Sequence, residues 1–176
     1  GQKYWQILPI CPTSYGDSPY QSFSSFAGNP YFIDLETLCK EKLLKKSECE
    51  ALPWGTNPQY VDYGKIYSSK YQLLKLAYTR FEKKIPEEFW KFCHDEKDWL
   101  NDYALFMALK DAHGGASWME WEDELRFRNW DALESARRKY AEDILYYKML
   151  QYLFYKQWDS LKAYVNEKGI EIKFFK

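Results

Sequence analysis

The chain has 176 residues, the length of one ordinary domain, so two complete domains are not expected. Its 25 Lys and Arg nearly balance 26 Asp and Glu, which leaves no excess positive charge to hold a nucleic-acid backbone or an anionic membrane surface. Aromatic residues make up 20%, including 16 Tyr and 8 Trp, and rings with an apolar face and a polar edge suit a neutral, hydroxyl-rich partner such as a sugar.

The cysteines and histidines form no metal or redox motif. The four cysteines contain no CxxC pair, and His94 and His113 lie nineteen positions apart, unlike the ligands of a zinc site. The sequence has neither a leader-like N-terminus nor a run of about 18 apolar residues. It therefore predicts a cytoplasmic protein with free thiols, no metal, no cofactor and no membrane contact.

The first predicted element is a strand followed by a long loop. Residues 4–10 (YWQILPI) form an almost continuous apolar run, typical of a strand buried on both faces of a parallel sheet. Residues 12–30 are rich in Pro, Gly, Ser and Asn, which predicts a loop at the carboxyl end of that strand.

Helices are predicted after this loop. Asp34 can cap a short helix through Leu38, and Ser47 with Glu50 reads as a capping box for a second one. Capping residues, Pro and Gly then predict three further helices, over residues 65–83, 86–94 and 98–112.

The last predicted helix is one long element from Asp131 to Gly169, with apolar residues every three or four positions and Gln151 interrupting the stripe. About 37 residues at about 1.5 Å each give roughly 55 Å, a length that needs neighbours to pack against. Residues 170–172 (IEI) then begin another strand, close to the last residue of the sequence. Strands at both ends of a mainly helical chain are what we expect of a stretch of a larger α/β protein.

The segment with the clearest functional signal is residues 14–35 (SYGDSPYQSFSSFAGNPYFIDL). A strand followed by a polar, tyrosine-rich loop is how barrel enzymes build the rim of an active site. Tyr15 and Tyr20 are predicted platforms for sugar rings. The predicted hydrogen-bonding partners of sugar hydroxyls are Asp17, Ser18, Gln21 and Asn29. The alternative is that the tyrosines only pack the loop against its helices.

The chain's acidic residues do not predict a catalytic pair. Glu142 and Asp143 are neighbours within the predicted long helix, where adjacent side chains diverge by about 100°. The acidic run at residues 120–124 is typical of a solvated surface, and His94 and His113 are expected at helix ends.

Several motifs resemble those of the 4-α-glucanotransferases of the amylomaltase, or disproportionating enzyme, family. They are QKYWQILPI, PTSYGDSPYQSFSSFAGNPYFIDLE, VDYGKIY, NDYALFMALKDAHGGASWMEW and QYLFYKQWDSLKAYVNEKGI, in the family's order and over nearly the whole chain. The resemblance implies a piece of an elaborated (β/α)8 TIM barrel, containing the second barrel strand, the helical insertion, a long helix and the start of the third strand. It divides the chain into residues 1–35, 36–130 and 131–176.

The same resemblance implies a glucan-processing activity and assigns roles to individual residues. Such enzymes transfer α-1,4-glucan segments between maltodextrins through a covalent intermediate on an Asp. Tyr20 is implied to stack on the donor sugar, with Ser18 as its hydrogen-bonding neighbour, whereas Tyr15 and Tyr67 line a second glucan groove. The two catalytic carboxyl groups of a retaining transfer come from later strands in the family. Their sequence contexts are absent here, so the chain alone is predicted to be inactive.

Two other functions remain open from the sequence, a stand-alone carbohydrate-binding module and a helical scaffold for a protein partner. Apolar residues of the first strand, among them Ile7, Leu8 and Ile10, also predict self-association if no neighbour covers them. The unfinished second strand favours a fragment of the transferase, because a module is expected to cap or complete such an edge.

Overall fold

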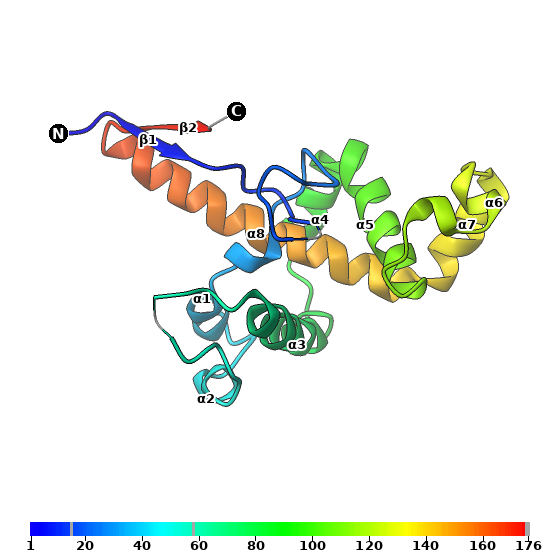
Figure 1. Ribbon diagram of the computed structural model, residues 1–176, viewed down its shortest axis with the longest axis horizontal. Helices are drawn as coiled ribbons and strands as arrows, with labels where there is room; N and C mark the ends of the chain where they lie inside the picture. The colour runs from blue at the N-terminus through cyan, green and yellow to red at the C-terminus, as the bar shows by residue number, and fades with distance from the viewer. Residues whose placement is uncertain (15, 58, 175–176) are drawn as a thin grey trace. The chain divides into compact units, whose positions relative to one another are not determined.

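The computed structural model describes residues 1–14, 16–57 and 59–174, and its regular structure is mainly helical, with one small sheet (Figure 1). The chain forms two compact units. One contains Gly1–Pro86 together with Leu150–Lys176, and the other contains Glu87–Met149. Helix α8 (Ala141–Glu167) begins in the second unit and ends in the first.

The predicted strands and helices occur in the predicted order, and short elements at residues 30–32, 118–120 and 123–126 are present in addition. The first unit contains β1 (Tyr4–Ile7), η1 (Pro30–Phe32), α1 (Leu35–Lys40), α2 (Lys46–Glu50), α3 (Tyr63–Phe81), most of α8, and β2 (Glu171–Phe174). The second contains α4 (Glu87–Asp95), α5 (Lys97–Ala112), η2 (Trp118–Glu120), α6 (Asp123–Arg126), α7 (Trp130–Lys139) and the first turns of α8.

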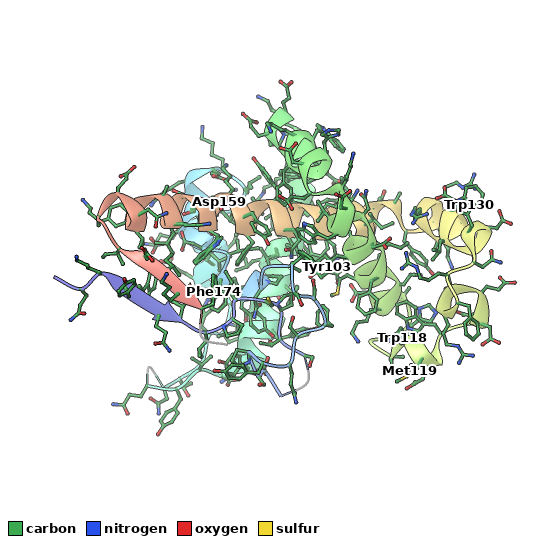
Figure 2. The ribbon with its side chains drawn as sticks, turned by 90° about the horizontal axis from the view of Figure 1, so that it is seen from above. Tyr103, Trp118, Met119, Trp130, Asp159 and Phe174 are labelled. Carbon is green, nitrogen blue, oxygen red and sulfur yellow. The ribbon has the colours of Figure 1, made fainter. Side chains whose placement is uncertain are left out.

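The two strands are parallel neighbours, as the apolar run predicted. Tyr4 pairs with Glu171 and Ile7 with Phe174, and Figure 1 shows the strands side by side. The prediction that the first strand is buried on both faces is wrong for this chain, because a two-stranded sheet leaves most of it uncovered and Tyr4 is 62% exposed. Helix α8 covers part of β2: the rings of Trp158 and Phe174, the latter labelled in Figure 2, lie 6.2 Å apart.

Two predicted helix starts have different outcomes. Asp34 caps α1 as expected, its Oδ2 accepting a 2.7 Å hydrogen bond from the Thr37 N–H. The predicted Ser47–Glu50 capping box is wrong. Helix α2 begins earlier, and Glu48 accepts a 2.8 Å hydrogen bond from the backbone N–H of Lys45. A glutamate three residues after the N-cap residue can accept the free backbone N–H of that residue, whatever the side chain of the N-cap residue is.

The predicted long helix is in fact two helices. Helix α7 is capped by Asn129, whose side chain accepts from two backbone N–H groups, and it ends at Tyr140, where φ is −109° and ψ is 26°. The charges fit a break at this point. Three basic residues fill the last turn of α7 and two acidic residues fill the first turn of α8, which matches the dipole at each helix end.

Buried apolar side chains form the core of each unit. In the first unit, Leu73 and Leu74 of α3 and Leu150 and Leu153 of α8 are at most 2% exposed. The second unit has a cluster of buried residues from α5, the η2 segment and α7, which are Leu105, Leu109, Trp121, Leu133 and Ala136.

No helix in the described part of the chain is both long and apolar enough to span a membrane.

Candidate functional site

The predicted sugar-contacting loop is a closed turn held by its own backbone. We call residues 14–21 the tyrosine loop. The Ser14 N–H donates to the Gln21 carbonyl over 3.0 Å, and the Gln21 N–H donates to the Ser18 carbonyl over 3.1 Å. Gly16 and Asp17 have φ of 84° and 53°, a conformation that glycine adopts freely and that aspartate tolerates better than most residues. Residues 14 and 16–21 are therefore held in a turn by these hydrogen bonds and by the backbone conformation of Gly16 and Asp17.

Ser18 and Tyr20 lie in the second half of this turn. The Ser18 Oγ accepts a 3.3 Å hydrogen bond from the Tyr20 backbone N–H, which leaves the hydroxyl proton of Ser18 able to donate to another group. The Tyr20 side chain is 58% exposed and so is accessible to a ligand. Tyr15, the other tyrosine predicted here, lies outside the described residues.

Tyr67 belongs to a group of aromatic rings on the first turns of α3. Its side chain is 60% exposed, and its ring lies 5.0 Å from that of Tyr71. Tyr31 of η1 is next in the group, with its ring 6.2 Å from Tyr71 and 6.3 Å from Tyr63. The sequence predicted Tyr67 as a contact residue but not these neighbours, which fix its ring.

Tyr31 connects this group electrostatically to the tyrosine loop. Burial, with smaller contributions from the negative charge of Asp17 and from Tyr67 and Tyr63, raises the pKa of Tyr31 to about 12. Its carbonyl accepts a 2.6 Å hydrogen bond from Nζ of Lys70, a lysine whose pKa burial lowers to about 8. Asp17 of the tyrosine loop and Tyr31 and Tyr63 of this ring group line the same groove.

Two glutamines of α8 hold the chain that follows the tyrosine loop. The fully buried Gln151 accepts from the Gly28 N–H over 2.7 Å and donates to the Gly28 carbonyl over 3.0 Å. Gln157 repeats the pattern with Asp34, over 2.7 and 3.2 Å. In both cases a side-chain amide accepts from the N–H and donates to the carbonyl of one residue, as the backbone of a neighbouring strand would. Gln151 was visible in the sequence as an interruption of an apolar stripe, but its partner was not.

Glycine is required at one of these contact points. A Cβ built on Gly28 would lie 2.0 Å from Cδ1 of Phe154, on the same helix as Gln151. The backbone of this segment therefore packs directly on the ring of Phe154. This close approach, together with the Gln151 hydrogen bonds, fixes the distance between the segment and α8.

A large apolar groove lies beside the tyrosine loop, and of the predicted sugar-contacting residues Asp17 and Asn29 line it. Its volume is about 1220 Å³, and residues of β1, η1, α1, the start of α3 and the second half of α8 line it. Asp17 and Pro19 of the tyrosine loop reach it, whereas Ser18, Tyr20 and Tyr67 do not. Among the described residues, those predicted to stack on sugar or to hydrogen-bond beside the stacking ring therefore lie outside the groove, whereas Asp17 and Asn29 line it.

The other hydrogen-bonding residues predicted from composition differ in exposure. Asn29 is only 5% exposed and caps η1, its Oδ1 accepting the Tyr31 N–H over 2.9 Å, although it also lines the groove. Gln21 is exposed, and Asp17 Oδ1 accepts a 3.3 Å hydrogen bond from Thr13 Oγ1.

The acidic residues and histidines have structural partners. Glu142 and Asp143 lie in the first turn of α8 rather than in the middle of a long helix. His113 ends α5, and its Nε2 lies 2.8 Å from Oε2 of Glu122, while its ring stacks on Trp121 at 5.0 Å. His94 is exposed in the last turn of α4, as predicted for a helix end.

Comparisons with known proteins agree with the motifs. The family model described as 4-alpha-glucanotransferase matches residues 1–174. The 4-alpha-glucanotransferase of Clostridium butyricum is 50% identical over 98% of this chain and 35% of its own length, and that of Thermus thermophilus is 49% identical over 98% and 34%. Amylomaltase from Streptococcus agalactiae, solved in complex with acarbose, superposes with a TM-score of 0.92 at 41% identity, covering 98% of this chain and 35% of that one.

The chain therefore spans about one third of the length of the relatives it matches. Within that third the match is continuous, and it includes the tyrosine loop, α3 and α8. The chain belongs to the 4-alpha-glucanotransferase family.

Proposed function

We propose that this chain provides a glucan-contacting surface of a 4-α-glucanotransferase that transfers α-1,4-glucan segments between maltodextrins. The observation that carries the proposal is the tyrosine loop. Its backbone is closed by hydrogen bonds, its Tyr20 ring is exposed, and it lies within a chain that the family model covers almost completely. An exposed ring held on a fixed backbone binds a sugar face with little loss of conformational freedom.

In this proposal each predicted residue has a specific role. Tyr20 stacks on a donor glucose unit, and the hydroxyl of Ser18, whose oxygen already accepts from the Tyr20 backbone, donates to a sugar oxygen. Tyr67 lies in a separate ring group on α3 and contacts a second stretch of the glucan, together with Tyr15. A related amylomaltase has been solved with acarbose, which supports a sugar ligand for this chain.

We place the catalytic carboxylates outside this chain. A retaining transfer needs two carboxyl groups about 5 to 5.5 Å apart, and the acidic side chains with ion pairs in the second unit are engaged with partners such as His113 and Arg126. The parallel pair β1 and β2, with α8 between them in sequence, is consistent with consecutive strands of a (β/α)8 barrel. The same proposal includes a division of the chain after residues 35 and 130. It also includes a cytoplasmic location and self-association through the exposed first strand.

A titration with maltoheptaose tests the binding role. The chain should bind it in the millimolar range, and Tyr20→Ala should weaken binding by about five- to thirtyfold, because stacking on one aromatic ring contributes roughly 1 to 2 kcal/mol. Tyr60→Ala is the matched control, since Tyr60 is 76% exposed and lies outside the tyrosine loop.

An activity assay tests the role of the missing carboxylates separately. The purified chain should release no glucose from maltotriose. Release of glucose together with longer maltodextrins would contradict the placement of the catalytic residues outside this chain. In the binding titration, an equal loss of affinity in Tyr20→Ala and Tyr60→Ala would contradict the role of the tyrosine loop.

A further inference from the structure

The second unit contains an open pocket of about 460 Å³. Four elements line it, through Trp90 of α4, Asn101 of α5, Arg137 of α7, and a face of α8 with Ala141, Ile144, Leu145 and Lys148. This volume is within the range of small-ligand sites, about 300 to 1000 Å³. All lining residues belong to Glu87–Met149, so the pocket is a feature of one unit.

The pocket contains the partly buried ammonium group of Lys148, whose hydrogen-bond partner is uncharged. Its Nζ lies 2.5 Å from Oδ1 of Asn101, a neutral acceptor. Among the described residues no carboxylate forms an ion pair with it, and the only neighbouring titratable group that affects its charge is the thiol of Cys93. Burial lowers the pKa of Lys148, and the Cys93 thiol opposes this effect. A partly buried cation without a counter-ion is stabilised by an anionic ligand.

The other charges around the pocket do not neutralise Lys148. Arg137 donates to Oε1 of Glu134 over 2.5 Å and lies 3.9 Å from Oδ1 of Asp102. Asp102 also pairs with Arg128 over 2.7 Å. Arg137 is therefore paired with two carboxylates, whereas the hydrogen-bond partner of Lys148 is the neutral amide of Asn101.

Trp90 provides a flat apolar surface in the same pocket. Its side chain is 52% exposed, although it is in a helix whose neighbouring Phe89 is fully buried. The Phe89 ring meets it edge-on, with centroids 4.9 Å apart and an interplanar angle of 69°, which restricts the orientation of the indole. With Ile144 and Leu145 of α8, the indole forms the apolar part of the pocket.

We propose that this pocket binds a small organic phosphate, with the phosphate on Lys148 and Arg137 and a ring of the ligand on the face of Trp90. A lysine that lacks a carboxylate acts as a point charge for a phosphate, and a guanidinium nearby adds directed donors. The ring is selected by Trp90, so inorganic phosphate alone makes only part of these contacts. The site is independent of the glucan surface proposed above, because none of its residues belongs to the tyrosine loop or to α3.

Two-dimensional NMR of the full chain, with phenyl phosphate and glucose 1-phosphate as probes, tests the proposal. Either probe should shift the Trp90 indole N–H and the resonances of residues around Lys148 at concentrations up to about 10 mM. Lys148→Met should weaken binding by at least about tenfold through loss of a charge-assisted hydrogen bond, and Lys148→Arg should retain it. Lys162→Met, the same charge change at an exposed position of α8, is the control.

The outcomes separate the parts of the proposal. Phosphate ester binding that survives Lys148→Arg and Lys162→Met but not Lys148→Met supports it, provided that the folded spectrum of the variants is unchanged outside the pocket. Absence of shifts with both esters overturns it. Inorganic phosphate binding as tightly as the esters contradicts the role of Trp90, and benzoate binding as tightly as phenyl phosphate contradicts the preference for phosphate.

Discussion

Replacing Gln151 by methionine should destabilise the first unit strongly. In the described part of the chain, the buried amide of Gln151 forms hydrogen bonds with both the N–H and the carbonyl of Gly28. Gln151 is 0% exposed, and its two hydrogen bonds measure 2.7 and 3.0 Å. Methionine keeps a similar volume and flexible shape but cannot donate or accept in the same way. The Gly28 N–H and carbonyl then lose their partners where water has little access.

The size of the effect follows from the number of groups left unpaired. Each buried backbone group without a partner costs about 1 to 3 kcal/mol, so the two groups of Gly28 together give about 2 to 6 kcal/mol. Gln157→Met removes the same pair of bonds from Asp34, which is exposed. Water can replace them there, and we expect a loss below about 1 kcal/mol.

Urea unfolding measures both variants under the same conditions. The signal should come from a probe in the first unit, for example the fluorescence of Trp158 in a background where the other tryptophans are replaced by phenylalanine. A difference between Gln151→Met and Gln157→Met of less than about 0.5 kcal/mol lies within the usual scatter of surface substitutions. Such a result would show that the buried amide does not hold the segment that follows the tyrosine loop.

Two pH titrations test other contacts. Hydrogen bonds to the Leu109 carbonyl and to Glu122 raise the pKa of His113 above its ordinary 6.5. The stability that this histidine contributes should therefore be full below pH 6.5 and be lost as the pH rises through the higher pKa of the folded chain. His113→Gln should lack this pH dependence in thermal unfolding, and an NMR titration of the ring with an unshifted pKa would contradict the prediction. Burial lowers the pKa of Lys70 from 10.5 to about 8, so between these pH values the unfolded chain binds more protons than the folded chain. The stability of the wild type relative to Lys70→Met should therefore increase from pH 8 to pH 10. A stability difference that stays constant over this range would refute the burial of a charged Lys70.

Local signals in the sequence were sufficient for most helices. Asp34 was predicted as a helix cap and is one, because a carboxylate accepts the first free N–H groups whatever the tertiary structure. The break at Tyr140 was missed, since apolar spacing continues from α7 into α8 and only the change from basic to acidic residues marks the boundary. Exposure of β1 could not be predicted, because it depends on which strands are present beside it.

The sequence was sufficient to choose the residues proposed to contact glucan, but it did not reveal the contacts that hold their segment in place. The loop's turn residues and the family motif together pointed to Ser18 and Tyr20, and both lie where a ligand can reach them. The contacts of Gln151 and Gln157 join residues 123 positions apart in sequence, so no local pattern could reveal them. Asn29 was predicted to hydrogen-bond a sugar because of its residue type, but its role as the cap of η1 was not predicted.

Contacts between the ring protons of Tyr20 and the sugar test the central claim most directly. With ¹³C-labelled tyrosine and saturating maltoheptaose, we expect intermolecular NOEs from the Tyr20 ring to the C–H groups of one face of a glucose unit, and these should disappear in Tyr20→Ala. Binding of maltoheptaose with NOEs to other tyrosines and none to Tyr20 would contradict the account, because the exposed ring of the tyrosine loop would then have no part in holding the glucan.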